Sequence, residues 1–132
     1  MFPKMNPYRQ SQISTASPGQ RVVMMYEALC RELHKAEDAC IKIPDDTAQI
    51  EVAHNALITS DRIITELRLA LDHELGGDLA KNLENLYDFW IRHLSDANRF
   101  KDAKRVAEVL KMAQELRETW REAAAKVRSG EV

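Results

Sequence analysis

Glu51 and His54 are the residues whose types and spacing come nearest to a reactive site in this sequence. A di-metal site in a helical bundle uses a Glu-x-x-His pair on each of two helices and one Glu from each of the other two. Glu51 and His54 form one such pair, and the other three histidines have no Glu three residues before them. A metal-binding or phosphotransfer protein that uses Glu51 and His54 is therefore only the alternative interpretation.

Other reactive arrangements have even less support. Histidine phosphotransfer domains typically carry a Lys three residues after the reactive histidine, and none of the four histidines has one. The sequence shows no Ser/His/Asp or Cys/His arrangement and no glycine-rich phosphate loop. We therefore predict a binding protein that is not an enzyme and needs no cofactor.

Composition and charge exclude several classes of partner. The chain has 132 residues, the size of one domain, and a net charge of −2 from 19 basic and 21 acidic residues. Because both signs are mixed along the chain and no basic stripe is present, we predict no nucleic-acid partner. No apolar run reaches the length of about 18 residues that a membrane-spanning helix needs, so we predict no membrane insertion.

Cys30 and Cys40 indicate an intracellular protein. They lie ten residues apart in one helical pattern, so their Cα atoms would be roughly 15 Å apart, too far for a disulfide. Reduced thiols are typical of the cytoplasm. The first ten residues also lack the apolar core of a signal peptide. We expect a cytoplasmic protein.

Four amphipathic stretches predict four helices, at about 18–43, 46–73, 78–98 and 102–127. Their apolar residues recur at steps of three and four, which is the period of a helix packed along one face. Short links make consecutive helices antiparallel. We therefore predict an all-α fold, an antiparallel up-down four-helix bundle over residues 17–128, preceded by an irregular N-terminal arm at 1–16.

Local signals predict where the helices begin. The segment 17–20, SPGQ, has the form of a capping box with Pro at the first helical position. Asp45 or Asp46 is expected to cap the second helix, and Asp102 the fourth. Each of these side chains can accept hydrogen bonds from the free N–H groups of a first turn.

Two further signals predict where helices end. The glycine pair at 76–77 is expected to stop the second helix and turn the chain into the third, since glycine adopts a positive φ without a steric penalty. Asn98 is expected to take the left-handed conformation at the end of the third helix. In the fourth helix, Trp120, the alanine pair 123–124 and Val127 continue the inward-facing row.

The arm at 1–16 is polar and is interrupted by prolines, and Met5, Tyr8 and Ile13 are its apolar exceptions. Composition alone allows two interpretations. The arm is a disordered tail that carries a few apolar residues, or it docks on the bundle through these three side chains.

The second predicted helix carries two apolar residues outside its core-facing row. Ile58 and Leu69 are eleven residues apart, about three helical turns, so they share one line along the helix. Asn55 and Arg62 lie on or near that line. A line of this kind is either ordinary exposed surface or part of a groove for a partner helix.

The third predicted helix also has apolar residues beyond its core-facing row. Tyr87 flanks the row, and Ile91 lies further round the helix. We add both residues to the candidate partner-binding surface.

Four sequence blocks, in order and at fitting spacing, resemble the FliS family of flagellar secretion chaperones. The most specific block is LDHELGGDLAKNL at 71–83, which continues into LYDF at 86–89. The others are NPY at 6–8, TASP at 15–18 leading to MMY at 24–26, and LRETW at 116–120. The resemblance covers the chain from Asn6 to about Glu122.

This resemblance implies a cytoplasmic helical bundle that binds the C-terminal segment of flagellin. That segment is disordered in the free monomer, and binding would prevent premature polymerisation and support secretion by the flagellar export system. The family's arm can occupy part of the binding surface, which implies a role for Met5 and Tyr8. Contacts with the export apparatus or a co-chaperone remain open at this point.

Overall fold

The structure, a computed structural model, describes residues 17–130. This part of the chain forms four helices and no strand: α2 (Pro18–Lys42), α3 (Gln49–Leu69), α4 (His73–Phe100) and α5 (Ala103–Ser129). The prediction of an all-α fold is confirmed. The arm lies outside the described residues, and so do Met5, Tyr8 and Ile13.

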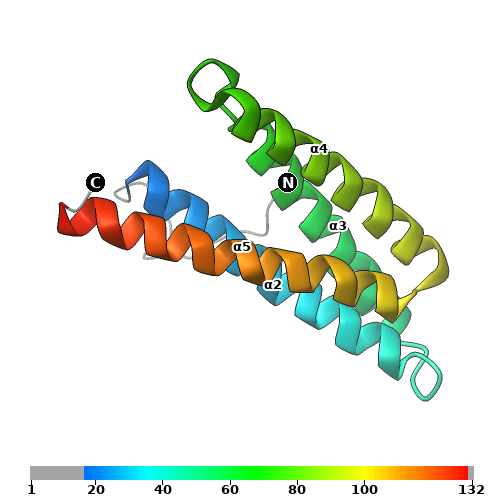
Figure 1. Ribbon diagram of the computed structural model, residues 1–132. Helices are drawn as coiled ribbons and strands as arrows, with labels where there is room; N and C mark the ends of the chain where they lie inside the picture. The colour runs from blue at the N-terminus through cyan, green and yellow to red at the C-terminus, as the bar shows by residue number, and fades with distance from the viewer. Residues whose placement is uncertain (1–16, 131–132) are drawn as a thin grey trace.

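The helices form an up-down bundle in which each helix has two neighbours. Helix α2 packs against α3 and α5, and α4 packs against the same two helices. Figure 1 shows the α2–α5 pair crossing the α3–α4 pair, with the two pairs close at the end that holds the α4–α5 turn and diverging towards the opposite end. The start of α2 and the end of α5 lie together at the diverging end (Figure 1).

Two helix starts follow their local sequence. The Ser17 hydroxyl accepts from the Gln20 N–H, and the Gln20 side chain accepts from the Ser17 N–H, which completes the predicted capping box. Asp102 accepts from the Lys104 N–H at the start of α5, as predicted. These bonds satisfy N–H groups that have no partner inside the helix.

Helix α3 begins later than predicted. Its N-cap is Ala48, which provides no side-chain hydrogen bond, instead of Asp45 or Asp46. The Asp46 carboxylate accepts from the Ala48 N–H at 3.1 Å and from the Gln49 side chain at 3.2 Å. Asp46 therefore organises the turn before the helix and does not cap its first turn.

The joint between α3 and α4 also differs from the prediction. Helix α3 ends at Leu69, and Asp72 caps α4 by accepting from the Glu74 and Leu75 N–H groups. The chain therefore turns before the glycine pair. Gly77 lies inside α4 with φ 50° and ψ −125°, where it interrupts the helix. The glycine pair does interrupt the helical path, but Asp72 caps a helical turn that begins before the pair.

Helix α4 ends at Phe100 with Lys101 as its C-cap, and not at the predicted Asn98. Lys101 takes the left-handed conformation, with φ 52°. Its ammonium group donates to the Asn98 carbonyl oxygen at 2.5 Å and to the Asn98 side-chain oxygen at 2.7 Å. Asn98 stays helical, and Lys101 satisfies carbonyl groups at the helix end.

The core is centred on aromatic residues from α2 and α4. Trp90 and Tyr26 are fully buried, and their ring centroids are 6.4 Å apart in an edge-to-face arrangement. Cys30 and Cys40 are buried and free, as expected from their spacing. Burial raises the pKa of both thiols, so they behave as small apolar core residues.

Gly77 gives the first testable prediction. Gly77→Ala should lower the free energy of unfolding by about 1–3 kcal/mol, because an L-residue is strained at this φ and ψ. Gly19→Ala is the control, since its new Cβ would lie an ordinary 3.8 Å from the Ala124 Cβ. Urea denaturation of both variants measures the difference. Equal stability of Gly77→Ala and the unmodified protein would contradict the interrupted geometry of α4.

Candidate functional site

An apolar groove of about 660 Å³ lies at the diverging end of the bundle. The start of α2, the end of α3 with the turn after it, α4, and the end of α5 all contribute to its walls. The lining residues are Ser17, Pro18, Gly19, Gln20, Val22, Leu67, Ala70, Leu71, Leu83, Tyr87, Trp120, Ala123, Ala124 and Val127. None of these described side chains carries a charge, so this part of the groove suits an apolar ligand.

Small residues keep the groove open on the α2–α5 side. Gly19 of α2 faces Ala124 of α5, and a Cβ at Gly19 would meet the Ala124 Cβ at 3.8 Å. Side chains of this size let the two helices approach closely, and they fill little of the space between the helix pairs. Ala123 and Val127, predicted to face inward, do line the groove, but they are exposed because nothing described covers them.

Ion pairs hold each wall of the groove together. In the α3–α4 wall, the Arg68 Nε of α3 is 2.8 Å from the Asp88 Oδ1 of α4. In the α2–α5 wall, an Arg121 guanidinium nitrogen is 2.9 Å from the Glu27 Oε2. These pairs are partly exposed, so each contributes little to stability, but each fixes one helix against its neighbour.

Among the predicted site residues that the structure describes, Tyr87 alone lines the groove. It is only 2% exposed, so it forms part of the inner wall and does not project from the surface. Its hydroxyl oxygen is 2.7 Å from the hydroxyl oxygen of Tyr26 on α2. Burial raises the pKa of both hydroxyls, so both remain neutral donors and acceptors.

The other predicted surface residues lie away from the groove. Asn55 and Arg62 are exposed on α3, Ile58 is half-buried, and Leu69 is 75% exposed. Ile91 of α4 is half-buried and packs against the core. None of these five side chains lines the groove. Their role in binding a partner stays a prediction.

Apart from Tyr87, the groove residues were missed because they come from four different helices. Trp120 and Val127, for example, fit an inward-facing row when α5 is read alone. The signal that could have revealed them is the run of small side chains at the end of α5. Ala123 and Ala124 cannot fill the core as the leucines earlier in the same helix do. Sequence reasoning counted these alanines only as interior positions.

The alternative site at Glu51 and His54 gains no support from the structure. The His54 Nδ1 lies 3.1 Å from the Asn98 amide nitrogen and 3.4 Å from its oxygen. Within residues 17–130, no three His, Cys, Asp or Glu side chains are grouped so that they could hold a metal ion.

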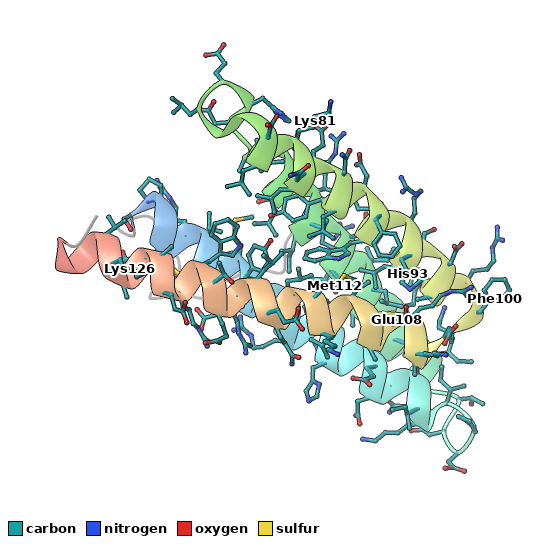
Figure 2. All side chains as sticks on the ribbon, in the orientation of Figure 1. Lys81, His93, Phe100, Glu108, Met112 and Lys126 are labelled. Atoms are coloured by element: carbon teal, nitrogen blue, oxygen red, sulfur yellow. The ribbon has the colours of Figure 1, made fainter. Side chains whose placement is uncertain are left out.

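His93 packs between α4 and α5. Figure 2 shows His93 on α4 near the place where α5 carries Glu108. The His93 Nε2 is 3.5 Å from the Glu108 Oε2, and the His93 ring stacks on Phe89 with centroids 5.0 Å apart. His93 therefore packs at the contact between the two helices. No helix in the described part of the chain is long and apolar enough to cross a membrane.

Comparisons with known proteins agree on one family. The family model described as flagellar protein FliS matches residues 1–127. The flagellar secretion chaperone FliS of Vibrio cholerae is 33% identical over 110 residues, 83% of this chain and 77% of the relative. That of Salmonella typhimurium is 32% identical over 117 residues, 89% of this chain and 84% of the relative. A crystal structure of a bacterial flagellar chaperone has the same fold, with a TM-score of 0.73 and 23% identity, covering 94% of this chain and 99% of that one.

The exposures of Ile58 and Leu69 predict different effects of the same substitution. Leu69→Asp should leave the free energy of unfolding within about 0.5 kcal/mol of its original value, because the side chain is already in solvent. Ile58→Asp should lower it by about 1–3 kcal/mol, because a half-buried apolar side chain is replaced by a charge. Thermal or urea unfolding followed by circular dichroism compares them. A stable Ile58→Asp variant would show that Ile58 contributes little to the core.

Proposed function

The chain belongs to the FliS family of flagellar secretion chaperones, and from this premise we propose that it binds the disordered C-terminal segment of flagellin. Bound in this way, the segment cannot pair with other flagellin molecules, so premature polymerisation is prevented. The flagellin is then held in a form that the flagellar export system can secrete.

The groove between the diverging helix pairs is the observation that carries this proposal. Its walls are apolar and uncharged, and its mouth lies between the ends of helices at the surface of the bundle. An amphipathic segment can place its apolar side chains in such a groove and form helical structure as it binds. The ordering of the segment opposes binding, so the buried apolar area must supply the affinity.

The proposed activity is binding without catalysis. As far as residues 17–130 form it, the lining offers no histidine, cysteine, carboxylate or amine, and its polar groups are those of Ser17, Gln20, Tyr87 and Trp120 together with the backbone. Such a surface supports recognition of a segment and places no general base beside the Ser17 hydroxyl to activate it as a nucleophile. We place this activity in the cytoplasm, where flagellin must be held before export.

A chaperone of this kind must also deliver its client. We therefore include the flagellar export apparatus, or a co-chaperone, among the proposed partners. Their contact surface must lie outside the groove, since the client occupies the groove. The line of Asn55, Ile58, Arg62 and Leu69 on α3, with Ile91 on α4, is our candidate for further partner contacts.

The arm at 1–16 is proposed to compete with the client. The arm joins the bundle at Ser17, which lies on the rim of the groove, so its apolar residues Met5, Tyr8 and Ile13 are tethered close to the client site. Tethering gives these residues a high effective concentration at the groove.

Replacing Met5 and Tyr8 by Ala should raise the affinity for the client several-fold, because the competing arm is weakened. Isothermal titration calorimetry with a C-terminal flagellin peptide measures this affinity. A synthetic peptide of residues 1–16, added to the double variant, should lower the apparent affinity again. Weaker client binding by the double variant would show that the arm assists the client instead.

The groove itself is tested with two alanines on α5. Ala123 and Ala125 are both exposed, but only Ala123 lines the groove. Ala123→Glu should weaken binding of the flagellin peptide by roughly tenfold or more, because a carboxylate would have to be desolvated in an apolar site. Ala125→Glu makes the same change two residues away and should leave the affinity unchanged.

The same titration checks the mode of binding. The unmodified protein should bind the peptide in a one-to-one complex with a negative heat-capacity change, and circular dichroism of the mixture should show a gain of helix. If a folded protein showed no binding, flagellin would not be its client. If both glutamate variants bound as tightly as the unmodified protein, the client would occupy another surface.

A further inference from the structure

Four aromatic residues with hydrogen-bond donors gather at the inner end of the groove. Tyr26 comes from α2, Tyr87 and Trp90 from α4, and Trp120 from α5. The Trp90 ring centroid is 5.5 Å from that of Tyr87 and 6.4 Å from that of Tyr26, and the Trp120 centroid is 6.2 Å from that of Tyr26. Tyr87 and Trp120 line the groove, whereas Tyr26 and Trp90 lie behind them.

This cluster has more donors than its internal bonds use. Each tyrosine carries one hydroxyl hydrogen, and the single bond between their oxygens, at 2.7 Å, uses only one of the two. The indole nitrogens of Trp90 and Trp120 are buried and have no hydrogen-bond partner among the described residues. An indole N–H that donated to a tyrosine oxygen would supply its own hydrogen. Both hydroxyl hydrogens would therefore still need an acceptor.

The position of the unused hydroxyl hydrogen depends on which tyrosine donates. If Tyr87 donates to Tyr26, the unused hydrogen belongs to Tyr26, which is fully buried and does not line the groove. If Tyr26 donates to Tyr87, the unused hydrogen belongs to Tyr87 in the groove wall. An acceptor in the groove would select the second arrangement, because it alone satisfies both hydroxyl groups.

The surroundings also limit the kind of acceptor. Burial raises the pKa of both tyrosine hydroxyls, which shows that this part of the molecule disfavours a negative charge. Within residues 17–130, no Lys or Arg lines the groove to compensate for an anion. A carboxylate would therefore bind poorly here, whereas an uncharged oxygen would satisfy the donor without a large desolvation penalty.

We propose that the Tyr87 hydroxyl donates a hydrogen bond to an uncharged oxygen of the segment that occupies the groove. The acceptor is the carboxamide of an Asn or Gln, the hydroxyl of a Ser or Thr, or an unpaired backbone carbonyl. This inference rests on the proposed function, since it assumes a client in the groove. The hydrogen bond adds one polar contact to the apolar contacts between the client and the groove. It thereby determines which residue of the client lies at the inner end of the groove.

Tyr87→Phe and Tyr26→Phe form a matched pair of variants. Each variant loses one of the two hydroxyl groups that share the buried hydrogen bond. Both should therefore lower the midpoint of urea denaturation to a similar extent. Of the two tyrosines, only Tyr87 lines the groove, so only Tyr87→Phe removes the donor of the proposed bond. Titration with the C-terminal flagellin peptide should give an affinity roughly three- to tenfold lower for Tyr87→Phe, and within about twofold of the original for Tyr26→Phe.

Peptide variants identify the acceptor. Each Asn, Gln, Ser and Thr of the peptide is replaced by Ala and titrated against the unmodified protein and Tyr87→Phe. One replacement should weaken binding to the unmodified protein and have no further effect on Tyr87→Phe, which identifies the side-chain acceptor. If Tyr87→Phe binds more weakly and no replacement shows this coupling, the acceptor is a backbone carbonyl.

Two results would overturn the inference and leave the proposed function intact. One is equal affinity of Tyr87→Phe and the unmodified protein. The other is an equal loss of affinity in both tyrosine variants, which would indicate a general effect of core packing. If the unmodified protein does not bind the peptide, the proposed function fails and this inference fails with it.

Discussion

The burial of Trp90 against the paired tyrosines is the constraint on which the rest of the bundle depends. Trp90 is fully buried, and its ring lies against Tyr26 of α2 and Tyr87 of α4. Side chains of this size set the separation between the α2–α5 pair and the α3–α4 pair at the middle of the bundle. Beyond them, α2 and α5 carry glycine and alanine, which cannot fill the same separation. The two helix pairs therefore leave a groove between them at this end of the bundle.

The same aromatic residues therefore belong to both the core and the groove. Tyr87 and Trp120 form the inner wall of the groove while their other faces pack against the core. This arrangement gives the groove a rigid inner end, because a side chain packed on several helices cannot move without loosening the core. Ion pairs such as Arg68–Asp88 and Arg121–Glu27 fix each helix to its neighbour within a wall. A client segment would meet a site that is largely formed before it binds.

Local sequence determined much of the fold. The capping box at Ser17 and the cap at Asp102 were predictable because each involves contacts within one turn of a helix. The α3–α4 joint was not, because two local signals competed there. Asp72 began a helical turn before the glycine pair was reached, and Gly77 became an interruption inside α4. At the end of α4, Lys101 took the left-handed conformation in place of Asn98, and its own ammonium group bonds to Asn98.

The sequence by itself determined the all-α fold, the helix order and the family, because helical periodicity, caps and motif blocks are properties of neighbouring residues. The tertiary structure alone decided where the groove lies. Ala123 and Val127 satisfy the same core-facing period as their buried neighbours, and only the divergence of the helix pairs leaves them exposed in a groove. Likewise, no spacing reveals that Tyr26 and Tyr87, 61 residues apart, share a hydrogen bond, since that contact arises only when α2 and α4 pack across the bundle.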